Sequence, residues 1–339
     1  MLSSMDLRHP EHHAVPTHLA KEHNVRGLRP EIVDEDAFVR PRLSSAARVV
    51  LVAGAVTETN ALLLRAIRAH GADARFVAPM HLDLAAARGG PVLGRLDVRP
   101  SLDGVEDGWW NLKRIELEGA HVLNRTGGLR ACHDKLETAL MLGRDGVPHP
   151  RTALVDGRSD LPSLEWPAVV KPRFGSWGKE VVLIRGRRAL DRHLKRISRE
   201  DWFLRHGALV QEFIPNNGSD LRVVIAGDKL IGTISRVAAP GEWRTNVSLG
   251  GIRRPAFPPP EARALALRAV RAVGADFVGV DLLRRPDGSY VVLELNGAVD
   301  FTPSYSLGGV DIFSSVARWV LAAATEAVAE SSLAGMTAV

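Results

Sequence analysis

The chain has 339 residues, of which 45% are hydrophobic and 24% are charged, and this composition indicates a soluble globular protein of two or three compact units rather than a disordered chain. No apolar run has the length of a membrane-spanning helix, and no apolar segment near the N-terminus is typical of a secretory signal, so we expect a cytoplasmic protein without a membrane partner. The formal net charge of +5 is modest, but it is unevenly distributed along the chain.

The first part of the chain is polar and rich in histidine. It holds five of the 12 histidines, several prolines and little apolar periodicity. We therefore expect residues 1–45 to form a disordered extension. A metal site built from His9, His12 and His13 is an alternative, but no distant ligand supports it.

Residues 46–130 are predicted to form a small α/β domain around a parallel sheet. The sequence RVVLVAGA (48–55) is typical of a buried strand, and TNALLLRAIRAHG (59–71) of a helix that ends at its glycine. A second strand is expected at ARFVAP (74–79). The order is a βαβ unit, with which a parallel sheet begins.

A strand at residues 121–124 and a helix from about Cys132 to Gly143 follow, and Pro148 and Pro150 mark a linker. Cys132 is the only cysteine, so the chain has no intramolecular disulfide. A lone cysteine is more often a small buried hydrophobic residue than a catalytic nucleophile, and we interpret Cys132 in that way.

A glycine-rich segment, VVKPRFGSWGKEVVLI, occupies residues 169–184. It is not a P-loop, because Lys179 is followed by Glu180 rather than by Ser or Thr, and because a second strand rather than a helix follows the loop. The segment predicts a lysine, Lys171, at the end of a strand, and a flexible loop that folds over phosphates.

A cluster of basic residues lies between Arg185 and Arg205, with helical periodicity. A solvated helix face, a docking surface for an acidic protein and a nucleic-acid site are the alternatives. No aromatic residues alternate with these arginines as a single-strand binder requires, so we expect no nucleic-acid partner.

The second half of the chain is predicted to be an antiparallel α+β unit. The segments 221–236 and 279–296 each contain two apolar strands around a short turn, at Gly227-Asp228 and at Asp287-Gly288. Between them, the sequence 258–276 is typical of a helix that begins with prolines and ends at a glycine.

The last hairpin brings acidic residues together. If Asp287 and Gly288 are its two central turn residues, Asp281 lies directly opposite Glu294, and Asn296 lies on the same face. Two facing carboxylates repel each other, which a bound cation would relieve, and Asp, Glu and Asn oxygens are suitable magnesium ligands. A slip of one residue in register would move Asp281 to the other face, and carboxylates on a solvated edge are the structural alternative.

Six ordered blocks of sequence resemble the ATP-grasp ligases, and specifically the RimK/LysX type, which join an amino acid to a carboxylate. The blocks are HDKLETALMLGRDGVPHPRTAL (133–154), VVKPRFGSWGKEV (169–181), VQEFIPNNGSDLRVVIAGD (210–228), SRVAAPGEWRTNVSLGG (235–251), GVDLL (279–283) and VLELNGAVDF (292–301). The resemblance runs from Asp134 to about Arg318, more than half of the chain.

The resemblance implies an ATP-grasp fold, in which two α+β lobes hold ATP, preceded by a small parallel-sheet domain. The expected boundaries are a pre-ATP-grasp domain at 46–130, a first lobe with the glycine-rich loop at 131–210, and a second lobe with the metal site at 211–330.

The resemblance also implies roles for individual residues. Lys135, Lys171 and Ser176 are expected at the ATP phosphates, Asp220 near the ribose, and Asp281, Glu294 and Asn296 as magnesium ligands. Adenine is expected against Gln211, Glu212, Phe213 and Ile214, with Arg244, Thr245 and Asn246 beside the phosphates. Arg222, Arg244 and Lys179 are the expected catalytic cations, of which Arg222 and Arg244 would hold an acylphosphate.

The implied reaction is ADP-forming amide synthesis between a carboxylate and the amine of a glutamate-like amino acid, with ATP and magnesium or manganese. The carboxylate belongs to a small molecule, a peptide or a carrier protein, and a homo-oligomer is an open alternative. A kinase of the same fold and a nucleotide-binding regulator are the rival functions. The segment 297–309 and the residues around Asn124 and Arg125 are expected to line the acceptor pocket.

Overall fold

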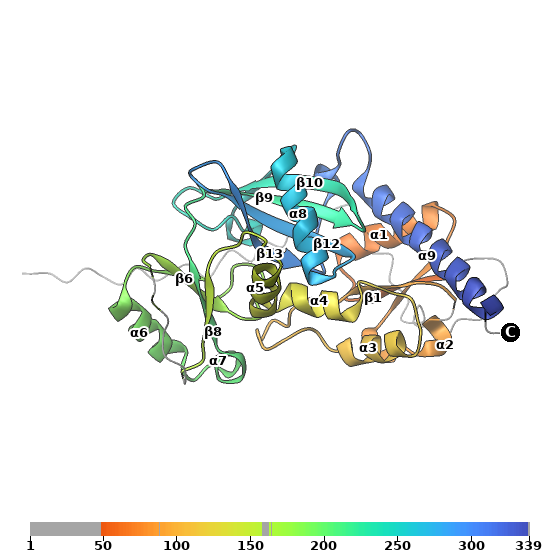
Figure 1. Cartoon of the computed structure of the whole chain (residues 1–339), viewed down its shortest axis with the longest axis horizontal. Coiled ribbons are helices and arrows are strands. Elements are labelled where there is room, and N and C mark those ends of the chain that lie inside the picture. Colours follow the sequence, from red (N-terminus) through yellow and green to blue (C-terminus); the bar gives the residue numbers. More distant parts are fainter. Residues whose placement is uncertain (1–48, 88, 158–162, 164, 338–339) are drawn as a thin grey trace, which may run out of the picture. The chain divides into compact units, whose positions relative to one another are not determined.

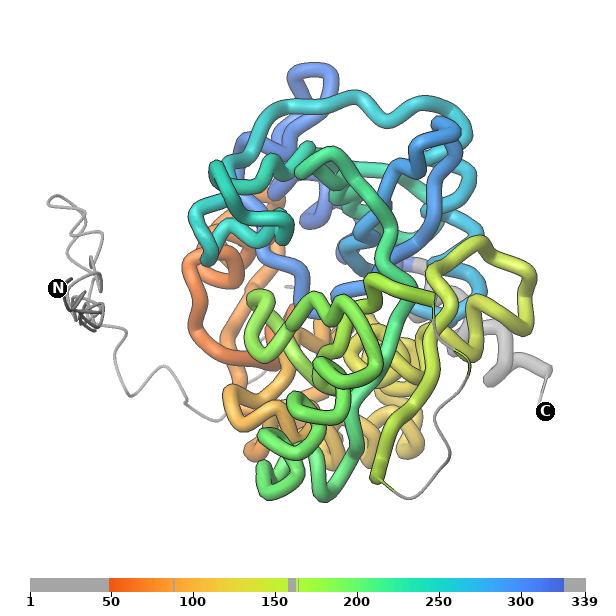
Figure 2. The backbone as a smooth tube through the Cα atoms, turned by 90° about the vertical axis from the view of Figure 1, so that its left-hand side faces the viewer, coloured from red at the N-terminus to blue at the C-terminus, as the bar shows by residue number. Residues whose placement is uncertain are grey.

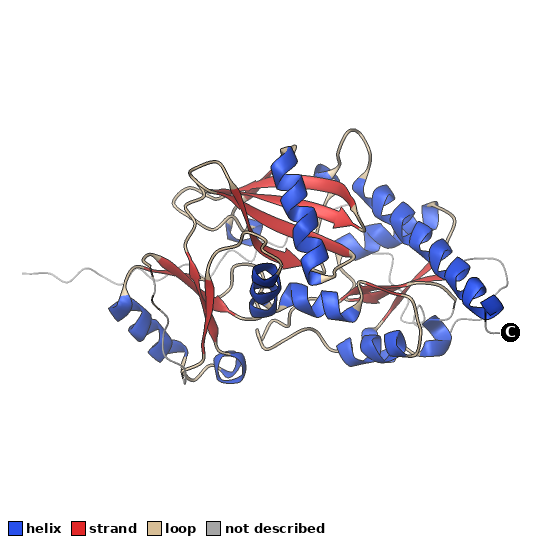
Figure 3. Cartoon of the chain, viewed as in Figure 1, coloured by secondary structure: helices blue, strands red, loops and turns tan. Residues whose placement is uncertain are grey.

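The computed structural model describes residues 49–87, 89–157, 163 and 165–337. The predicted extension 1–45 and its histidines lie outside the described residues. The described chain forms three separate sheets, one parallel and two antiparallel, with helices packed against them (Figures 1 and 3). The mixture of α/β and α+β architecture predicted from the sequence is confirmed.

The first sheet is parallel and has the strand order β2-β1-β3-β4. Its elements are β1 (Val49–Gly54), α1 (Glu58–Ala69), β2 (Asp73–Val77), the 3-10 turn η2 (Pro79–His81), α2 (Leu84–Ala87), β3 (Val92–Arg95), α3 (Trp109–Leu117) and β4 (Val122–Leu123). The predicted βαβ unit is confirmed. All six residues of β1 are buried, which explains why its sequence shows no alternation of polar and apolar residues.

The second sheet is antiparallel, with the order β5-β8-β6-β7. Its elements are β5 (Thr152–Val155), β6 (Ala168–Pro172), β7 (Val182–Ile184), α6 (Arg187–Ile197), α7 (Asp201–His206) and β8 (Ala208–Glu212). Figure 2 views the chain from the side of this lobe, which is drawn in green. The glycine-rich loop connects β6 to β7, as expected.

The basic cluster lies mainly on α6. The helix buries Leu190 and Ile197 against the second sheet, so its arginines lie on the remaining, solvent-facing side. Arg187 pairs with Asp191 at 2.9 Å, and Arg196 pairs with Glu180 at 2.5 Å.

The third sheet is antiparallel, with the order β11-β10-β9-β12-β13. Its elements are β9 (Ser219–Ala226), β10 (Lys229–Val237), η3 (Val247–Leu249), β11 (Ile252–Pro255), α8 (Pro260–Val273), β12 (Phe277–Arg284), β13 (Tyr290–Asn296), η4 (Pro303–Tyr305) and α9 (Ile312–Thr337). Both predicted hairpins and the predicted helix are present. The helix ends where Gly274 adopts a positive φ of 66°.

Two hydrophobic layers cover this sheet. On one side, α8 packs Leu265 and Val270 against apolar residues of β9 and β12. On the other side, α9 packs with α1 and with residues of β9 and β10, so that one core joins the first and third sheets. No helix in the described part of the chain is long and apolar enough to cross a membrane.

The helix predicted from Cys132 to Gly143 is two helices, α4 (Thr126–His133) and α5 (Lys135–Arg144). The break falls at Asp134, whose carboxylate accepts hydrogen bonds from the backbone N–H groups of Leu136 and Glu137 and so caps α5. Cys132 is buried in the core, as expected.

The hairpin β12-β13 has the predicted pairing but not the predicted turn. Asp281 pairs with Glu294, and Gly279 with Asn296. The turn, however, is a three-residue connection closed by a hydrogen bond from Arg285 N to Ser289 O, with Gly288 at a positive φ of 88°. A register shift between Asp281 and Leu282 compensates for the extra turn residue and restores the predicted pairs.

Candidate functional site

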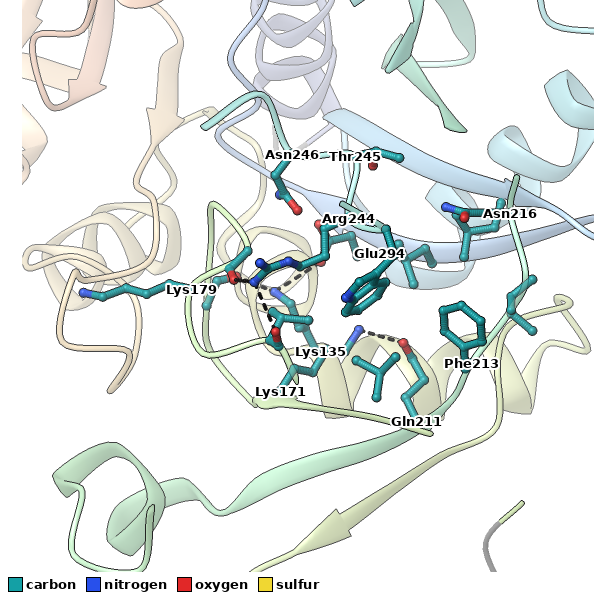
Figure 4. A pocket seen from close by; sticks show the side chains of 18 of the residues that line it. Lys135, Lys171, Lys179, Gln211, Phe213, Asn216, Arg244, Thr245, Asn246 and Glu294 are labelled. Carbon is teal, nitrogen blue, oxygen red and sulfur yellow. Dashed lines mark hydrogen bonds and ion pairs between the residues drawn. The ribbon is translucent and has the colours of Figure 1, made fainter. Parts of the chain in front are cut away.

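A cleft of about 790 Å³ lies between the second and third sheets (Figure 4). It is lined by the ends of β6, β8 and β13, by the glycine-rich loop and by the segment that follows β10. Of the residues predicted to bind nucleotide, those that line it are Lys135, Lys171, Ser176, Gln211, Glu212, Phe213, Ile214, Arg244, Thr245 and Asn246.

Lys171 lies at the end of β6 and is only 4% exposed. Its Nζ donates a hydrogen bond of 2.8 Å to Oε1 of Gln211, which lies on the neighbouring strand β8 (Figure 4). Burial lowers the pKa of Lys171 from 10.5 to about 8, and the nearby positive charge of Lys135 acts in the same direction, whereas Glu294 opposes it. A buried ammonium group of this kind is stabilised when an anion binds beside it.

Lys135, at the start of α5, is the second lysine of the cleft. Its Nζ lies 2.5 Å from the carbonyl oxygen of Gly175 and 3.4 Å from Oε2 of Glu294. The same side chain therefore contacts the glycine-rich loop and the predicted metal-binding strand. An anion bound in the cleft can contact both lysines at once.

The glycine-rich loop, residues 175–180, has an unusual backbone. Trp177, Gly178 and Glu180 all have φ between 55° and 72°. Contacts from two sides hold the loop: Ser248 Oγ donates to the Trp177 carbonyl at 2.9 Å, and Lys179 Nζ donates to the Pro100 carbonyl at 2.9 Å. These contacts hold the loop against the cleft that its residues line.

Lys179 and Arg244, both predicted to be catalytic, differ in orientation. The ammonium group of Lys179 points away from the cleft centre, toward its partner Pro100 (Figure 4). Arg244 donates from Nη1 to the Gly178 and Val181 carbonyls at 3.2 Å, and it pairs with Glu242 at 2.7 Å. Arg244 thus lies against the inner side of the loop, whereas Lys179 is placed to hold the loop down.

The far end of the cleft is apolar and fits a flat aromatic base. Phe213 packs edge-to-face against Trp243, with their ring centroids 5.8 Å apart. Further lining comes from residues that the sequence analysis did not name for this site: Val169, Val181, Asn216, Leu283 and Leu293. The sequence indicated these residues only by their positions near the ends of predicted strands, next to predicted site residues.

A second cavity of about 640 Å³ adjoins the first. The two share four wall residues, Ser176, Trp177, Asn246 and Glu294. The second cavity is otherwise lined by charged residues and by the segment that follows β13, including Asp300 and Tyr305. Of the segment 297–309, Ala298, Val299, Asp300 and Tyr305 line this cavity, and its role as an acceptor pocket stays a prediction.

Asn124 and Arg125, also expected at the acceptor pocket, line neither of these two cavities. Asn124 is fully buried, and its amide hydrogen-bonds the backbone of Asp276, Phe277 and Gly297. Arg125 pairs with Asp276 at 3.2 Å. Both residues connect the segment after β4 to the third sheet, and the expected acceptor role for them stays a prediction that these two cavities do not support.

One face of the third sheet carries a network of arginines and carboxylates. Asp281 is fully buried and accepts two hydrogen bonds of 2.7 Å from Arg222 and a third of 2.7 Å from Arg236. Arg236 also donates to Asp220, at 2.8 Å from its Nε, and Thr245 Oγ1 donates to Asp220 at 2.5 Å. The two guanidinium groups hold the pKa of Asp281 well below its ordinary value, despite burial.

This network changes two expectations. Arginines balance the charge of Asp281, and Lys135 balances that of Glu294. The repulsion between the facing carboxylates is therefore relieved by side chains, and a metal ion is not required for it. Asp220 is 5% exposed and lines neither of these two cavities, because its carboxylate is used by Arg236 and Thr245. Its ribose-binding role remains a prediction without geometric support.

The predicted metal ligands differ in how well they fit a divalent cation. Glu294 lines both cavities, and Asn296 lines the second. The Asn296 side chain makes no hydrogen bond within the described part of the chain: its buried Nδ2 donor is unsatisfied, and its Oδ1, the atom that a cation would contact, accepts none. Glu294 and Asn296 therefore fit a hard cation, whereas Asp281 could offer an oxygen only if Arg222 or Arg236 gave up a bond. Among the described residues, no group of three or more His, Cys, Asp or Glu side chains could hold a metal ion.

Comparison with known proteins was consistent with this geometry. The model of the RimK-like ATP-grasp domain matches residues 132–320. The chain is 31% identical, over 75% of its length and 91% of the relative's, to the glutamate–LysW ligase ArgX of Sulfurisphaera tokodaii. It is 36% identical to a probable alpha-L-glutamate ligase 2 of Shewanella frigidimarina, over 55% of this chain and 63% of that protein.

Solved structures share the fold. A RimK domain ATP-grasp protein from Sphaerobacter thermophilus superposes with a TM-score of 0.58 at 25% identity, over 81% of this chain and all of that one. D-alanine–D-alanine ligase from Bacillus anthracis complexed with ATP superposes with a TM-score of 0.61 over 84% of this chain and all of that one, and at 19% identity it shows the fold alone.

Proposed function

Because the chain belongs to the RimK-like ATP-grasp family, we propose that it is an ATP- and magnesium-dependent ligase that phosphorylates a carboxylate and joins it to the amine of an amino acid. The observation that carries this proposal is the wall shared by the two cavities. A nucleotide whose base lies against Phe213 and whose phosphates lie at Lys171 and Lys135 would end at Glu294, where the second cavity begins. Phosphoryl transfer across that wall requires no large movement of either ligand.

The proposed nucleotide contacts follow from charge and polarity. Lys171 and Lys135 neutralise phosphate charge, and the loop residue Ser176 lies close enough to add a hydroxyl donor. Phe213, Ile214 and Leu293 provide apolar surface for adenine, and Gln211 and Glu212 provide polar groups at the end of β8. Thr245 and Asn246 line the cleft beside the loop.

Glu294 and Asn296 would hold magnesium, and manganese is an alternative; Asp281 would join them after losing an arginine bond. A bound divalent cation would supply charge neutralisation for the transferring phosphoryl group. Arg222, which donates only from Nε and Nη2 to Asp281, lines the second cavity and is placed to hold the acylphosphate from that side. Arg244 would do so from the loop side.

In the proposed reaction a carboxylate oxygen attacks the γ-phosphorus, and ADP leaves. The amine nitrogen then attacks the acyl carbon, the C–N bond forms, and the bond to the phosphate oxygen breaks. The two protons lost by the ammonium group pass to phosphate and to solvent. The glycine-rich loop would exclude water, which otherwise hydrolyses the mixed anhydride.

The proposed incoming amino acid is glutamate. Its support is the similarity to proteins named glutamate–LysW ligase and alpha-L-glutamate ligase. The carboxylate partner proposed on the same ground belongs to a peptide or a small carrier protein. Lys171, Lys135 and Glu294 form the proposed catalytic centre for either.

The test is a trapping experiment with purified protein, ATP, magnesium and candidate carboxylates, using hydroxylamine in place of the amino acid. An acylphosphate reacts with hydroxylamine to give a hydroxamate, which mass spectrometry identifies. A kinase that phosphorylates a hydroxyl group gives a stable phosphate ester and no hydroxamate. Phosphate ester formation, or ATP binding without turnover of any carboxylate, would contradict the proposal.

A further inference from the structure

The second cavity carries charges that the protein itself does not balance. Arg222 and Arg236 line it, but both are paired with buried carboxylates, and Glu294 is paired with Lys135. After these pairs are set aside, the remaining charged groups on the wall are Arg253, Asp97 and Asp300. A charged ligand would gain the most binding free energy from contacts with these three residues.

Arg253 is an exposed residue of β11 with no hydrogen bond or ion pair in the described part of the chain. It lies directly opposite Arg236 on β10. Two like charges at facing positions of an antiparallel pair destabilise the sheet slightly, and nothing in the described chain compensates at Arg253. A bound anionic group between the strand and the cavity would remove that cost.

Asp97 and Asp300 carry the opposite charge on the same cavity. Asp300 has no hydrogen-bond partner in the described residues. Asp97 accepts from the Val98 N–H at 2.7 Å and from Ser176 of the loop at 3.3 Å, and it lies 3.8 Å from Nδ1 of His133. Burial lowers the pKa of His133, so its neutral ring does not balance the charge of Asp97 at pH 7. The buried guanidinium group of Arg95 interacts electrostatically with both carboxylates, but its hydrogen bonds go to Asn60 and to the Val299 carbonyl instead. The two carboxylates therefore keep a net negative charge toward the cavity.

We infer that this cavity recognises two of the three charged groups of the incoming amino acid: Arg253 binds the side-chain carboxylate of a dicarboxylic amino acid, and Asp300, with Asp97, binds its ammonium group. The inference rests on the proposed function and adds the residues that select the amino acid. A monocarboxylic amino acid would leave Arg253 unpaired, and a dicarboxylic acid without the amine would meet the two aspartates with no cation.

The test is calorimetric binding of three probes, L-glutamate, L-glutamine and glutarate, to protein saturated with ADP and magnesium. L-glutamine lacks the side-chain carboxylate, and glutarate lacks the ammonium group. Wild type should bind L-glutamate more tightly than either analogue. Arg253→Gln should weaken L-glutamate binding about tenfold and leave L-glutamine binding unchanged, since a charge-assisted pair is lost only for L-glutamate. Asp300→Asn should weaken L-glutamate and L-glutamine but not glutarate.

The matched control is Arg254→Gln, because Arg254 is equally exposed on the same strand but faces Ser235 and lines neither cavity. It should bind all three probes as wild type does, and Arg253→Lys should recover part of the preference for L-glutamate. Equal binding of L-glutamate by Arg253→Gln and wild type would overturn the inference, as would an equal loss for all probes. If ADP and magnesium fail to bind wild type, the proposed function itself fails; normal nucleotide binding with unselective probe binding removes only the inference.

Discussion

At the scale of single residues, the state of Lys171 depends on the fold more than that of any other cation in the cleft. The ammonium group is held by Gln211 and shielded from water, and burial lowers its pKa to about 8. Since folding lowers the pKa below the unfolded value of 10.5, the charged form destabilises the folded protein. That cost is fully present below pH 8 and disappears as the pH rises toward 10.5.

The lowered pKa predicts a pH dependence of nucleotide binding. If phosphate binds only the protonated form of Lys171, about a tenth of the protein is competent at pH 9, so the Kd for ADP with magnesium should rise about tenfold between pH 7 and pH 9. Lys171→Met should bind weakly at both values, nearly abolish turnover and leave the unfolding temperature at pH 7 unchanged or slightly higher. A pH-independent Kd in wild type, or normal turnover in the variant, would place the phosphate site elsewhere.

A second prediction concerns Glu294, which contacts Lys135 and lines both cavities. Glu294→Gln should lose most activity through weakened magnesium binding. Without ligands its stability should change by less than about 1 kcal/mol, because it loses one partly exposed ion pair. Melting curves check this: ADP with magnesium should raise the melting temperature of wild type much more than that of the variant. Equal shifts in both proteins would show that Glu294 is not a ligand.

The sequence brought together most of the residues that line the first cleft, because these residues follow strand ends and lie in the blocks that resemble the family. It did not predict the arginine network, because Arg236 and Arg222 meet Asp220 and Asp281 only through the pairing of β9, β10 and β12. No local pattern states which arginine faces which carboxylate. The free charge of Arg253 depends on the same pairing.

At the scale of elements, the β12-β13 hairpin keeps the predicted strand pairing although its turn differs from the predicted one. Pro286 and Gly288 favour a three-residue connection, which alone would move Glu294 out of line with Asp281. The register shift next to Asp281 corrects the pairing. Turn chemistry can be read from sequence, but an irregularity inside a buried apolar strand leaves no comparable pattern.

The glycine-rich loop yields an element-scale prediction at Gly178. A Cβ there would lie 2.8 Å from Oδ1 of Asn246, and the φ of 72° is unfavourable for other residues by about 1–2 kcal/mol. Gly178→Ala should therefore lower kcat about tenfold by disfavouring the closed loop, with little change in melting temperature. The control is Gly186→Ala, whose Cβ meets nothing within 4 Å and whose backbone is extended. Equal activity of both variants would show that the closed loop is not needed for turnover.

At the scale of the whole molecule, the account depends on two cavities that meet at one wall. The third sheet supplies groups to both, the second sheet and its loop line the first cleft, and Asp97, which follows β3, lines the second cavity. The predicted boundaries at 46–130, 131–210 and 211–330 remain proposals for how these parts divide. The fold class could be predicted because the hydrophobic periodicity changes from one segment to the next. The core that α1 and α9 form together could not be predicted, since the two helices lie far apart in the sequence.

The most direct test of the central claim follows ¹⁸O from a labelled carboxylate substrate to the released phosphate. The substrate is the carboxylate that hydroxylamine trapping identifies, with both of its oxygens labelled. An acylphosphate retains one carboxylate oxygen in its P–O bond when the amine attacks the acyl carbon, so the account predicts ADP and phosphate that carries one ¹⁸O atom per amide formed. Unlabelled phosphate, or AMP with pyrophosphate, would contradict it.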